Sequence, residues 1–226
     1  MRIRRLVLLR HGQTEYNAGN RMQGQLDTDL SELGREQAAA AAEVLAKRQP
    51  LVIVSSDLRR ALDTATALAE RSGVTVSVDT RLRETHLGDW QGLTHLEVDA
   101  EAPGARLAWR DDARWAPHGG ESRVDVAERS APLVAELLAQ LDDWGSDEAG
   151  DASDRPVVLV AHGGLIAALT AALLALPVDN WPVLGGMGNA SWVQLSGHSA
   201  DDAVPQDVRW RLDVWNASAQ VANDVL

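Results

Sequence analysis

Residues 3–12 read IRRLVLLRHG, and residues 157–164 read VVLVAHGG. Each stretch is a short apolar run that ends in a histidine followed by glycine. Apolar runs of this length are typical of strands buried in a parallel sheet. Ligands of open α/β sheets bind beyond the carboxyl ends of the strands. If the two strands are neighbours, His11 and His162 therefore share one edge of the sheet.

The rest of the chain alternates between predicted strands and helices. The other strands are expected at residues 51–54, 74–78, 191–195 and 208–214. Helices are expected at residues 31–48, 56–71 (with Ser56 as N-cap), 122–144 and 164–176. This order predicts an α/β fold: a doubly wound, mostly parallel sheet flanked by helices, in a single domain over residues 1–226. Residues 85–121 are expected to form a small irregular cap over the carboxyl ends of the strands.

The composition excludes several classes of protein. Cysteine is absent, which rules out thiolate nucleophiles, disulfides, iron–sulfur clusters and Cys-ligated zinc. Lys47 is the only lysine and lies near the end of a predicted surface helix, which argues against Schiff-base enzymes and Walker-type nucleotide binders. The net charge of −12 argues against nucleic acid as a partner, because phosphate contacts need a basic surface.

One long uncharged run is a candidate membrane span. Residues 157–178 contain no Asp, Glu, Lys or Arg, but the helical part at 165–176 is shorter than the roughly 20 residues of a span. A buried strand, a glycine turn and a buried helix explain this run better. The N-terminus has four consecutive apolar residues, against roughly 7–15 in a signal peptide. We therefore expect a cytoplasmic protein without a membrane partner.

Charged residues follow the other predicted strands in the same way. An arginine in the first turn after residues 51–54, Arg59 or Arg60, can reach the edge that holds the histidines, and Glu84 follows the next strand. Arginine binds phosphate oxygens in pairs, imidazole can attack phosphorus, and a carboxylic acid can protonate a leaving alkoxide. The set favours a phosphate site, although each residue alone also fits a structural role.

Five motifs in order resemble the histidine phosphatase superfamily, whose fold is described as phosphoglycerate mutase-like. They are LVLLRHGQTEYNAGNRMQGQLDTDLSELGREQA at 6–38, SSDLRRALDTA at 55–65, RLRETHLGDWQGLT at 81–94, GGES at 119–122 and VVLVAHGGLI at 157–166. The match covers most of the chain. The resemblance implies a phosphomonoesterase that uses a phosphohistidine intermediate and requires no metal or other cofactor.

The resemblance also implies a role for individual residues. His11 resembles the phosphorylated nucleophile and Glu84 the proton donor. The phosphate pocket corresponds to Arg10, Arg60 and His162, with further contacts from Asn17, Gln23, Gly24 and Gly163. Arg59 precedes the matching position, so we expect it to be a surface charge.

A second set of segments resembles a narrower group within the superfamily, actinobacterial phosphatases that convert a glucosylated 3-phosphoglycerate to glucosylglycerate. This reaction is an early step towards methylglucose lipopolysaccharides. The segments are RMQGQLDT at 21–28, RETHLGDWQGLTH at 83–95, APGARLAWR at 102–110, WAPHGGESRVDV at 115–126, GGMGNASW at 185–192 and RWRLDVWNASAQV at 209–221. The resemblance implies a small phosphorylated sugar acid as substrate and a homodimer.

The cap residues favour a phosphatase over a mutase. The mutase branch resembles a longer cap with its own Lys and Arg anchors, whereas this cap has no lysine and carries Trp109, Trp115 and His118. Tryptophan faces suit a sugar ring, so Trp115 and His118 are predicted to bind substrate, although the tryptophans also fit a cap core. The glycerate carboxylate could be bound by arginines that equally fit solvated surfaces: Arg106, Arg110, Arg114 and Arg123.

Other functions remain as alternatives. They are a broad-specificity histidine acid-type phosphatase, a cofactor-dependent phosphoglycerate mutase, a metal site formed by His11, His162 and Glu84, and a phosphate-binding module without catalysis. Two arginines in the same pocket would repel a metal cation. A non-catalytic module would be expected to lack the nucleophile or the acid, and this chain has both residues.

Overall fold

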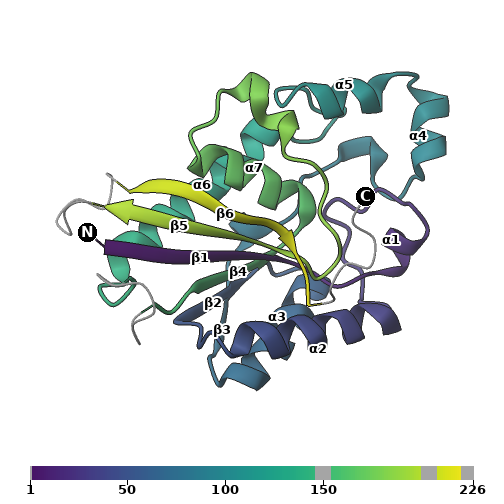
Figure 1. Cartoon of the computed structure of the whole chain (residues 1–226). Helices are drawn as coiled ribbons and strands as arrows, with labels where there is room; N and C mark the ends of the chain where they lie inside the picture. The colour runs from purple at the N-terminus through teal and green to yellow at the C-terminus, as the bar shows by residue number, and fades with distance from the viewer. Residues whose placement is uncertain (1, 146–153, 200–207, 220–226) are drawn as a thin grey trace.

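The computed structural model describes residues 2–145, 154–199 and 208–219. Within these ranges one six-stranded sheet has the order β3-β2-β4-β1-β5-β6 (Figure 1). The strands are β1 (Arg2–Arg10), β2 (Val52–Ser55), β3 (Val76–Val78), β4 (Val157–Ala161), β5 (Trp192–Ser199) and β6 (Arg209–Ala217). The first four are mutually parallel, and β5 and β6 continue the sheet in antiparallel pairing. The predicted mostly parallel α/β sheet is confirmed.

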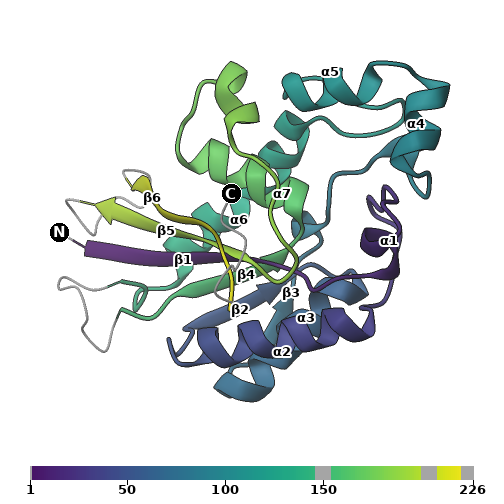
Figure 2. The same cartoon turned by 45° about the vertical axis from the view of Figure 1, so that its right-hand side comes forward.

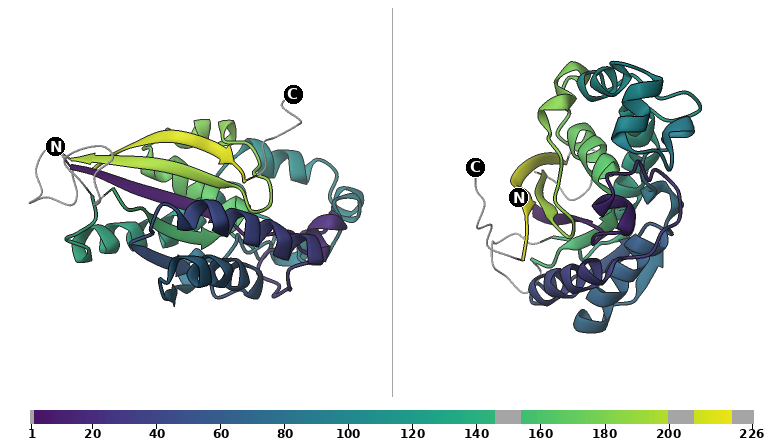
Figure 3. Two further views of the ribbon diagram at one scale, coloured as in Figure 1. Left: turned by 60° about the horizontal axis from the view of Figure 1, so that its bottom comes forward. Right: turned by 90° about the vertical axis from the view of Figure 1, so that its right-hand side faces the viewer.

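Helices cover both faces of the sheet and connect its parallel strands (Figures 2 and 3). The α-helices are α1 (Glu15–Ala18), α2 (Glu32–Ala46), α3 (Arg59–Ser72), α4 (His95–Glu101), α5 (Ala105–Asp111), α6 (Arg123–Gln140) and α7 (Gly163–Leu173). Three 3₁₀ helices are η1 (Thr80–Leu82), η2 (Gly88–Trp90) and η3 (Val178–Val183). None of these helices has the length and apolarity to cross a membrane.

The central strand β1 has two buried faces. Leu6 and Leu8 pack with residues of α6 and α7, whereas Val7 and Leu9 pack with residues of α2 and α3. All four side chains have no solvent exposure. Because successive residues of a strand point to opposite faces, a strand covered on both sides must be apolar throughout. This explains the continuous apolar run by which the sequence predicted the strand.

The ends of the helices correct several predicted boundaries. Ser56 does not cap α3, because its N–H donates to the carbonyl of Val160 and so continues the pairing of β2 with β4. The helix begins at Arg59, with Leu58 as its N-cap. Helix α6 ends at Gln140, and α7 ends at Leu173, shortly before Ala175 takes a left-handed conformation (φ 51°). The third strand is also shorter than predicted and begins at Val76.

Residues 85–121 contain η2, α4 and α5 joined by turns. Figures 1 and 2 show α4 and α5 on the side of the molecule towards which β1 and β4 point. Their apolar contacts are made largely within this segment and with Met22: Leu87, Trp90 and Val98 are buried together there. This small cluster is separate from the two that cover the sheet.

Candidate active site

Two histidines lie side by side at the carboxyl ends of the central strands. Strand β1 pairs with β4 in a register that sets Arg10 opposite Ala161, and the N–H of His11 donates to the Ala161 carbonyl at 3.1 Å. His11 and His162 therefore follow neighbouring strand ends, and their ring centroids are 5.1 Å apart. The two strands are neighbours, which is the condition under which the sequence placed both histidines at one edge of the sheet.

The contacts of His11 define its tautomer. Its Nδ1 lies 2.6 Å from the carbonyl oxygen of Gly12, which can only accept, so Nδ1 carries the hydrogen. Its Nε2 lies 3.3 Å from Nε of Arg60, which can only donate, so Nε2 keeps its lone pair. His11 is therefore neutral, with its hydrogen on Nδ1 and a lone pair on Nε2. This is the form in which a histidine can act as a nucleophile.

Burial keeps both histidines neutral. Desolvation lowers the pKa of His11 well below its ordinary value, and the positive charges of Arg60 and Arg10 lower it further. The pKa of His162 is lowered well below its ordinary value in the same way, first by burial and then by Arg60. Both rings are thus neutral at physiological pH in the protein without a bound anion.

The two neutral histidines predict that mild acid weakens the fold. In the unfolded chain each binds a proton below its ordinary pKa of 6.5, whereas in the native chain each does not. The unfolded state then holds more protons, so the free energy of unfolding falls as the pH drops below about 6.5, by at most about 1.4 kcal/mol per pH unit for each histidine. Urea unfolding in phosphate-free buffer between about pH 7.5 and pH 5.5 measures this slope.

A matched pair of variants isolates the contribution of His11. The His11→Asn variant should lose part of the slope, because one of the two buried titrating groups is gone. The His118→Asn variant should keep the slope, because the side chain of His118 is 92% exposed. An unchanged slope in His11→Asn would contradict the assignment of a neutral buried His11.

Arg60 is a buried cation in the first turn of α3. Its side chain donates to the carbonyls of Leu26 and Gly24 at 2.7 and 2.8 Å, and only 1% of the residue is exposed. Burial lowers the pKa of Arg60 to about 10, against the opposing effect of Glu84, so the group is charged at neutral pH. Arg59, in contrast, is half exposed and pairs with Asp27 at 3.0 Å, which fits the predicted surface charge.

Arg10 supplies a second cation, partly buried, at the end of β1. Its Nη1 donates to the carbonyl of Met187, and among the described residues its buried Nε has no hydrogen-bond partner. Burial lowers the pKa of Arg10, and Glu84 opposes the shift. A Cβ placed on Gly163 would lie 3.5 Å from that Nε, so Gly163 borders the same group. An unpaired buried guanidinium N–H is costly unless an anion accepts from it.

Glu84 reaches the site from the loop after η1. Its Oε2 accepts from the N–H of Gly164 at 3.0 Å, and its Oε1 accepts from the N–H groups of Leu165 and Thr85 at 3.0 and 2.8 Å. The carboxyl group therefore lies at the N-terminus of α7 and accepts from N–H groups that have no partner within the helix. A Cβ on Gly164 would lie 2.6 Å from Oε1, so this close approach requires glycine.

His162 is oriented by a residue that the sequence suggested for another role. Its Nε2 lies 2.9 Å from Oγ of Ser56, and among the described residues its buried Nδ1 has no hydrogen-bond partner. Ser56, fully buried at the end of β2, thus contacts the site instead of capping α3. The hydroxyl fixes the ring and leaves Nδ1 available to a ligand.

Two amide side chains face the pocket with their nitrogen atoms. The oxygen of Gln23 accepts from the hydroxyls of Thr14 and Thr28 at 2.9 and 2.8 Å, and the oxygen of Asn17 accepts from the N–H of Thr14 at 3.1 Å. With their oxygens engaged, the NH₂ groups are left to donate to an anion. Gly24 has φ +53°, and a Cβ there would lie 2.3 Å from Gln91, so the turn that aims its carbonyl at Arg60 needs glycine.

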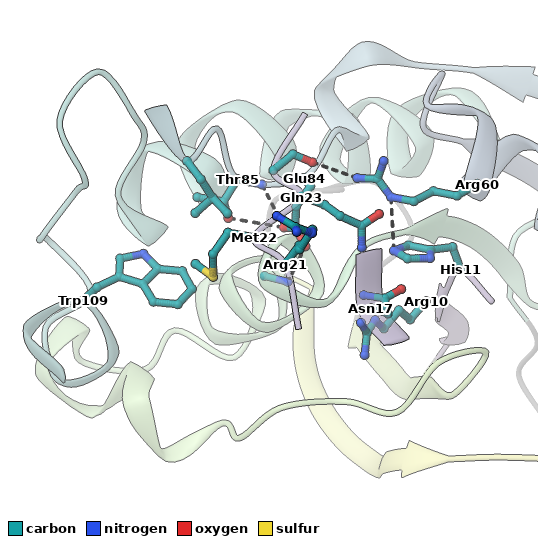
Figure 4. A pocket seen from close by; sticks show the side chains of 13 residues that line it. Arg10, His11, Asn17, Arg21, Met22, Gln23, Arg60, Glu84, Thr85 and Trp109 are labelled. Carbon is teal, nitrogen blue, oxygen red and sulfur yellow. Dashed lines mark hydrogen bonds between the residues drawn. The ribbon is translucent and has the colours of Figure 1, made fainter. Parts of the chain in front are cut away.

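These side chains line one pocket. Figure 4 shows His11 and Arg60 at one end and Trp109 at the opposite end. The lining residues are Arg10, His11, Asn17, Arg21, Met22, Gln23, Gly24, Arg60, Glu84, Thr85, Leu87, Trp109 and Gly164. His162 and Gly163 adjoin this lining through the contacts described above. The pocket thus joins a cationic end, rich in hydrogen-bond donors, to an apolar end.

The cap residues are placed differently from the prediction. Trp115 does not line the pocket, because it stacks on Trp90 with centroids 5.4 Å apart. His118 is exposed, and its Nδ1 lies 2.8 Å from Asp89. Trp109 does line the pocket and packs edge-on against Trp90. Among the described residues, no group of three or more His, Asp or Glu side chains is placed to hold a metal ion.

The four arginines that the sequence analysis named for the glycerate carboxylate also lie outside the lining. Arg106 pairs with Asp99 at 2.8 Å, and Arg114 pairs with Asp179 at 2.6 Å. Arg123 lies over the ring of Trp109, 5.6 Å from its centroid. Apart from Arg10 and Arg60, the arginine that lines the pocket is Arg21. We call the part of the pocket lined by Arg21 and Trp109 the outer pocket, and the part around His11 and Arg60 the inner pocket. Arg21 lies in the first motif, between the predicted site residues Asn17 and Gln23, and this proximity is the signal that could have identified it.

Comparison with known proteins gives three close matches in addition to a family. A model of the histidine phosphatase superfamily (branch 1) matches residues 6–217. A glucosyl-3-phosphoglycerate phosphatase from Mycolicibacterium vanbaalenii is 83% identical, and one from Mycobacterium tuberculosis (strain H37Rv) is 76% identical, each over the full length of both chains. A solved structure of a mycobacterial glucosyl-3-phosphoglycerate phosphatase with VO₃ has a TM-score of 0.89 and 76% identity, and covers 95% of this chain and 100% of that chain.

Proposed function

Because the chain belongs to the histidine phosphatase superfamily (branch 1), we propose that it is a phosphomonoesterase that forms a phosphohistidine on His11. The observation that carries the proposal is the contact of a neutral His11 Nε2 with the buried cation Arg60 at 3.3 Å. A phosphoryl group at this position would meet the nucleophile and its charge stabilisation together. Positioning and electrostatic stabilisation supply most of the catalysis in phosphoryl transfer.

The reaction proceeds in two balanced steps. In the first, Nε2 of His11 forms a bond to phosphorus as the bond to the ester oxygen breaks, and protonated Glu84 gives its proton to that oxygen. Arg10, Arg60 and His162 bind the phosphoryl oxygens, with donors from Asn17, Gln23, Gly24 and Gly163. In the second step Glu84 accepts a proton from water, the water oxygen bonds to phosphorus, and the bond to nitrogen breaks. Inorganic phosphate and the restored imidazole result.

The substrate that we propose is glucosyl-3-phosphoglycerate, with glucosylglycerate as product in the synthesis of methylglucose lipopolysaccharides. Two relatives with this activity in their names match the chain over its full length at 83% and 76% identity. The outer pocket supports a substrate of this shape, because Arg21 offers a cation for the glycerate carboxylate and Trp109 a flat apolar face for a sugar ring. We assign the sugar to Trp109 in place of Trp115.

Several further properties belong to the same proposal. The enzyme needs no metal or cofactor, since the nucleophile, the acid and the cations are all side chains of this chain. It acts in the cytoplasm, where a phosphorylated sugar acid would be available. It forms a homodimer, and the edge strand β6, with Val214 39% exposed, offers a surface for association. Sedimentation of the purified protein measures the oligomeric state.

Phosphate release in the presence of EDTA tests the substrate. We expect clear preference for glucosyl-3-phosphoglycerate over 3-phosphoglycerate and nitrophenyl phosphate. The Trp109→Leu variant should raise the KM for the glucosylated substrate several-fold, because the sugar ring would lose a flat apolar face against which to pack. Trp115→Leu is the matched control, since this ring belongs to the same cluster but lies outside the pocket lining.

The other outcomes identify the alternatives. Similar modest rates on all three esters would indicate a broad-specificity phosphatase. Isomerisation of 3-phosphoglycerate without phosphate release would indicate a mutase. Loss of activity in EDTA that added metal restores would contradict the metal-independent reaction.

A further inference from the structure

Glu84 lies in a segment that has no regular secondary structure. Residues 83–87, between η1 and η2, belong to no helix or strand. The position of Glu84 therefore depends on side chains from other elements. Its carbonyl oxygen accepts from Nη2 of Arg129 at 2.9 Å and from Nε2 of Gln25 at 3.0 Å.

Arg129, on α6, binds this segment at two points. Besides the carbonyl of Glu84, its guanidinium donates through Nη1 to the carbonyl of Arg81 at 2.7 Å. The same guanidinium is held by Glu121 through two contacts, Nε to Oε1 at 2.8 Å and Nη2 to Oε2 at 3.0 Å. The two side chains are 22% and 24% exposed, so water screens this pair only partly. A paired guanidinium of this kind is fixed in direction as well as in place.

Glu121 holds the other side of Glu84. Its Oε2 accepts from the N–H of His86 at 2.8 Å, and its own N–H donates to the carbonyl of His86 at 2.7 Å. The pair of Glu121 and Arg129 thus binds the backbone before, at and after Glu84. These bonds replace the pairing that a strand or helix would give to a catalytic residue.

We propose that Arg129 and Glu121 are positioning residues for the proton donor, and that they set the backbone from which the Glu84 carboxyl group meets the leaving oxygen. The inference rests on the proposed function, because it takes Glu84 as the acid. Proton transfer requires heavy atoms within about 2.6–3.2 Å. A displacement of about 1 Å at a reacting group can cost roughly 100-fold in rate. Neither residue lines the pocket, so neither is expected to bind the substrate.

The test compares leaving groups, because an acid matters only when the leaving group needs a proton. Purified full-length variants are assayed on the best alkyl phosphate among the substrates and on nitrophenyl phosphate, whose phenolate leaves without protonation. In Arg129→Met we expect the kcat on the alkyl ester, divided by the kcat on nitrophenyl phosphate, to fall about 10- to 100-fold, up to the cost of a displacement of about 1 Å at a reacting group. Arg129→Lys should recover part of the ratio, and Glu121→Gln should lower it.

Arg81→Met is the matched control. The Arg81 side chain makes comparable ion pairs, with Glu136 at 2.7 Å and Asp79 at 2.8 Å, and within the described residues its hydrogen bonds go to these two carboxylates and not to Glu84 or Glu121. Its kcat ratio should stay within about twofold of the unaltered enzyme, because the side chain that is removed pairs with Asp79 and Glu136 and not with the backbone around Glu84. Melting temperatures of all variants record any loss of stability separately from the ratio.

Three results would overturn the inference: equal loss on both esters in Arg129→Met, no loss on either ester, or the same change of ratio in Arg81→Met. A double variant distinguishes failure of the positioning role of Arg129 from failure of the proposed acid role of Glu84. In the Glu84→Gln background, Arg129→Met should cost less than about threefold on the alkyl ester, because the acid that it positions is already absent. If Glu84→Gln alone shows no dependence on leaving group, the acid role in the proposed function fails. If the loss of kcat depends on the leaving group in Glu84→Gln but not in Arg129→Met, only the positioning role fails.

Discussion

Replacing His11 by alanine is expected to lower the rate of phosphate release by about 10⁶-fold, the order of magnitude found when an enzyme loses its nucleophile. The imidazole is the only group of the protein that our proposal gives a bond to phosphorus. The variant keeps Arg10 and Arg60, so it should still bind inorganic phosphate or vanadate. Binding without turnover would distinguish loss of the nucleophile from loss of the pocket.

Chemical trapping gives a direct measurement. Rapid quenching of the unaltered enzyme during turnover of a ³²P-labelled ester should give an acid-labile, base-stable phosphoprotein, as expected for a phosphoimidazole. His11→Ala should give none. His118→Ala is the matched control, because its ring is exposed and lies outside the pocket lining. Label that persists in His11→Ala, or full turnover by that variant, would show that another group attacks phosphorus.

Replacing Glu84 by glutamine is expected to slow hydrolysis of alkyl phosphates about 10²- to 10⁴-fold, the usual contribution of a general acid. Nitrophenyl phosphate should lose far less, because its leaving group needs little protonation. The amide cannot supply the proton, although it keeps the size of the carboxyl group. Steady-state kcat on both classes of ester measures the difference, and equal losses would contradict the acid role.

A structural effect of this variant must be measured separately. The carboxyl group of Glu84 accepts from the N–H groups of Gly164 and Leu165 at the start of α7. In glutamine one of the two acceptors becomes an NH₂ group, which would face a backbone donor. We therefore expect a lower melting temperature in Glu84→Gln, whereas Glu84→Asp keeps the carboxyl group but withdraws it by one methylene. In both variants, the loss of activity is compared with the loss of melting temperature. If activity falls in proportion to melting temperature and does not depend on the leaving group, Glu84 has a structural role.

Much of the fold and of the inner pocket could be predicted from the sequence, because both follow from strand pairing. The continuous apolar runs at β1 and β4 are dictated by burial on both faces, and parallel pairing then brings His11 and His162 together. The same logic brought Arg60 and Glu84 to this edge. What these residues do in the reaction is still a prediction, and the variants above test it.

The cap could not be predicted in the same way. Its helices α4 and α5 have seven residues each, too few for a clear periodic pattern. Which tryptophan faces the pocket depends on packing within the segment: Trp115 stacks on Trp90, and this leaves Trp109 at the pocket. Ser56 fits the usual pattern of an N-cap, but the backbone pairing of β2 with β4 extends through it. Tertiary contacts decided both cases.

The strand order also has a consequence for synthesis of the protein. Strand β1 leaves the ribosome first, yet both of its neighbours in the sheet, β4 and β5, come from the last third of the chain. At translation rates of about 5–20 residues per second, β1 waits roughly 7–30 s before β4 is made. Throughout this interval an apolar strand with two open edges must avoid pairing with other chains. The site around His11 is therefore completed only after β4 and β5 have been made, and fragments that stop before β4 should aggregate without activity.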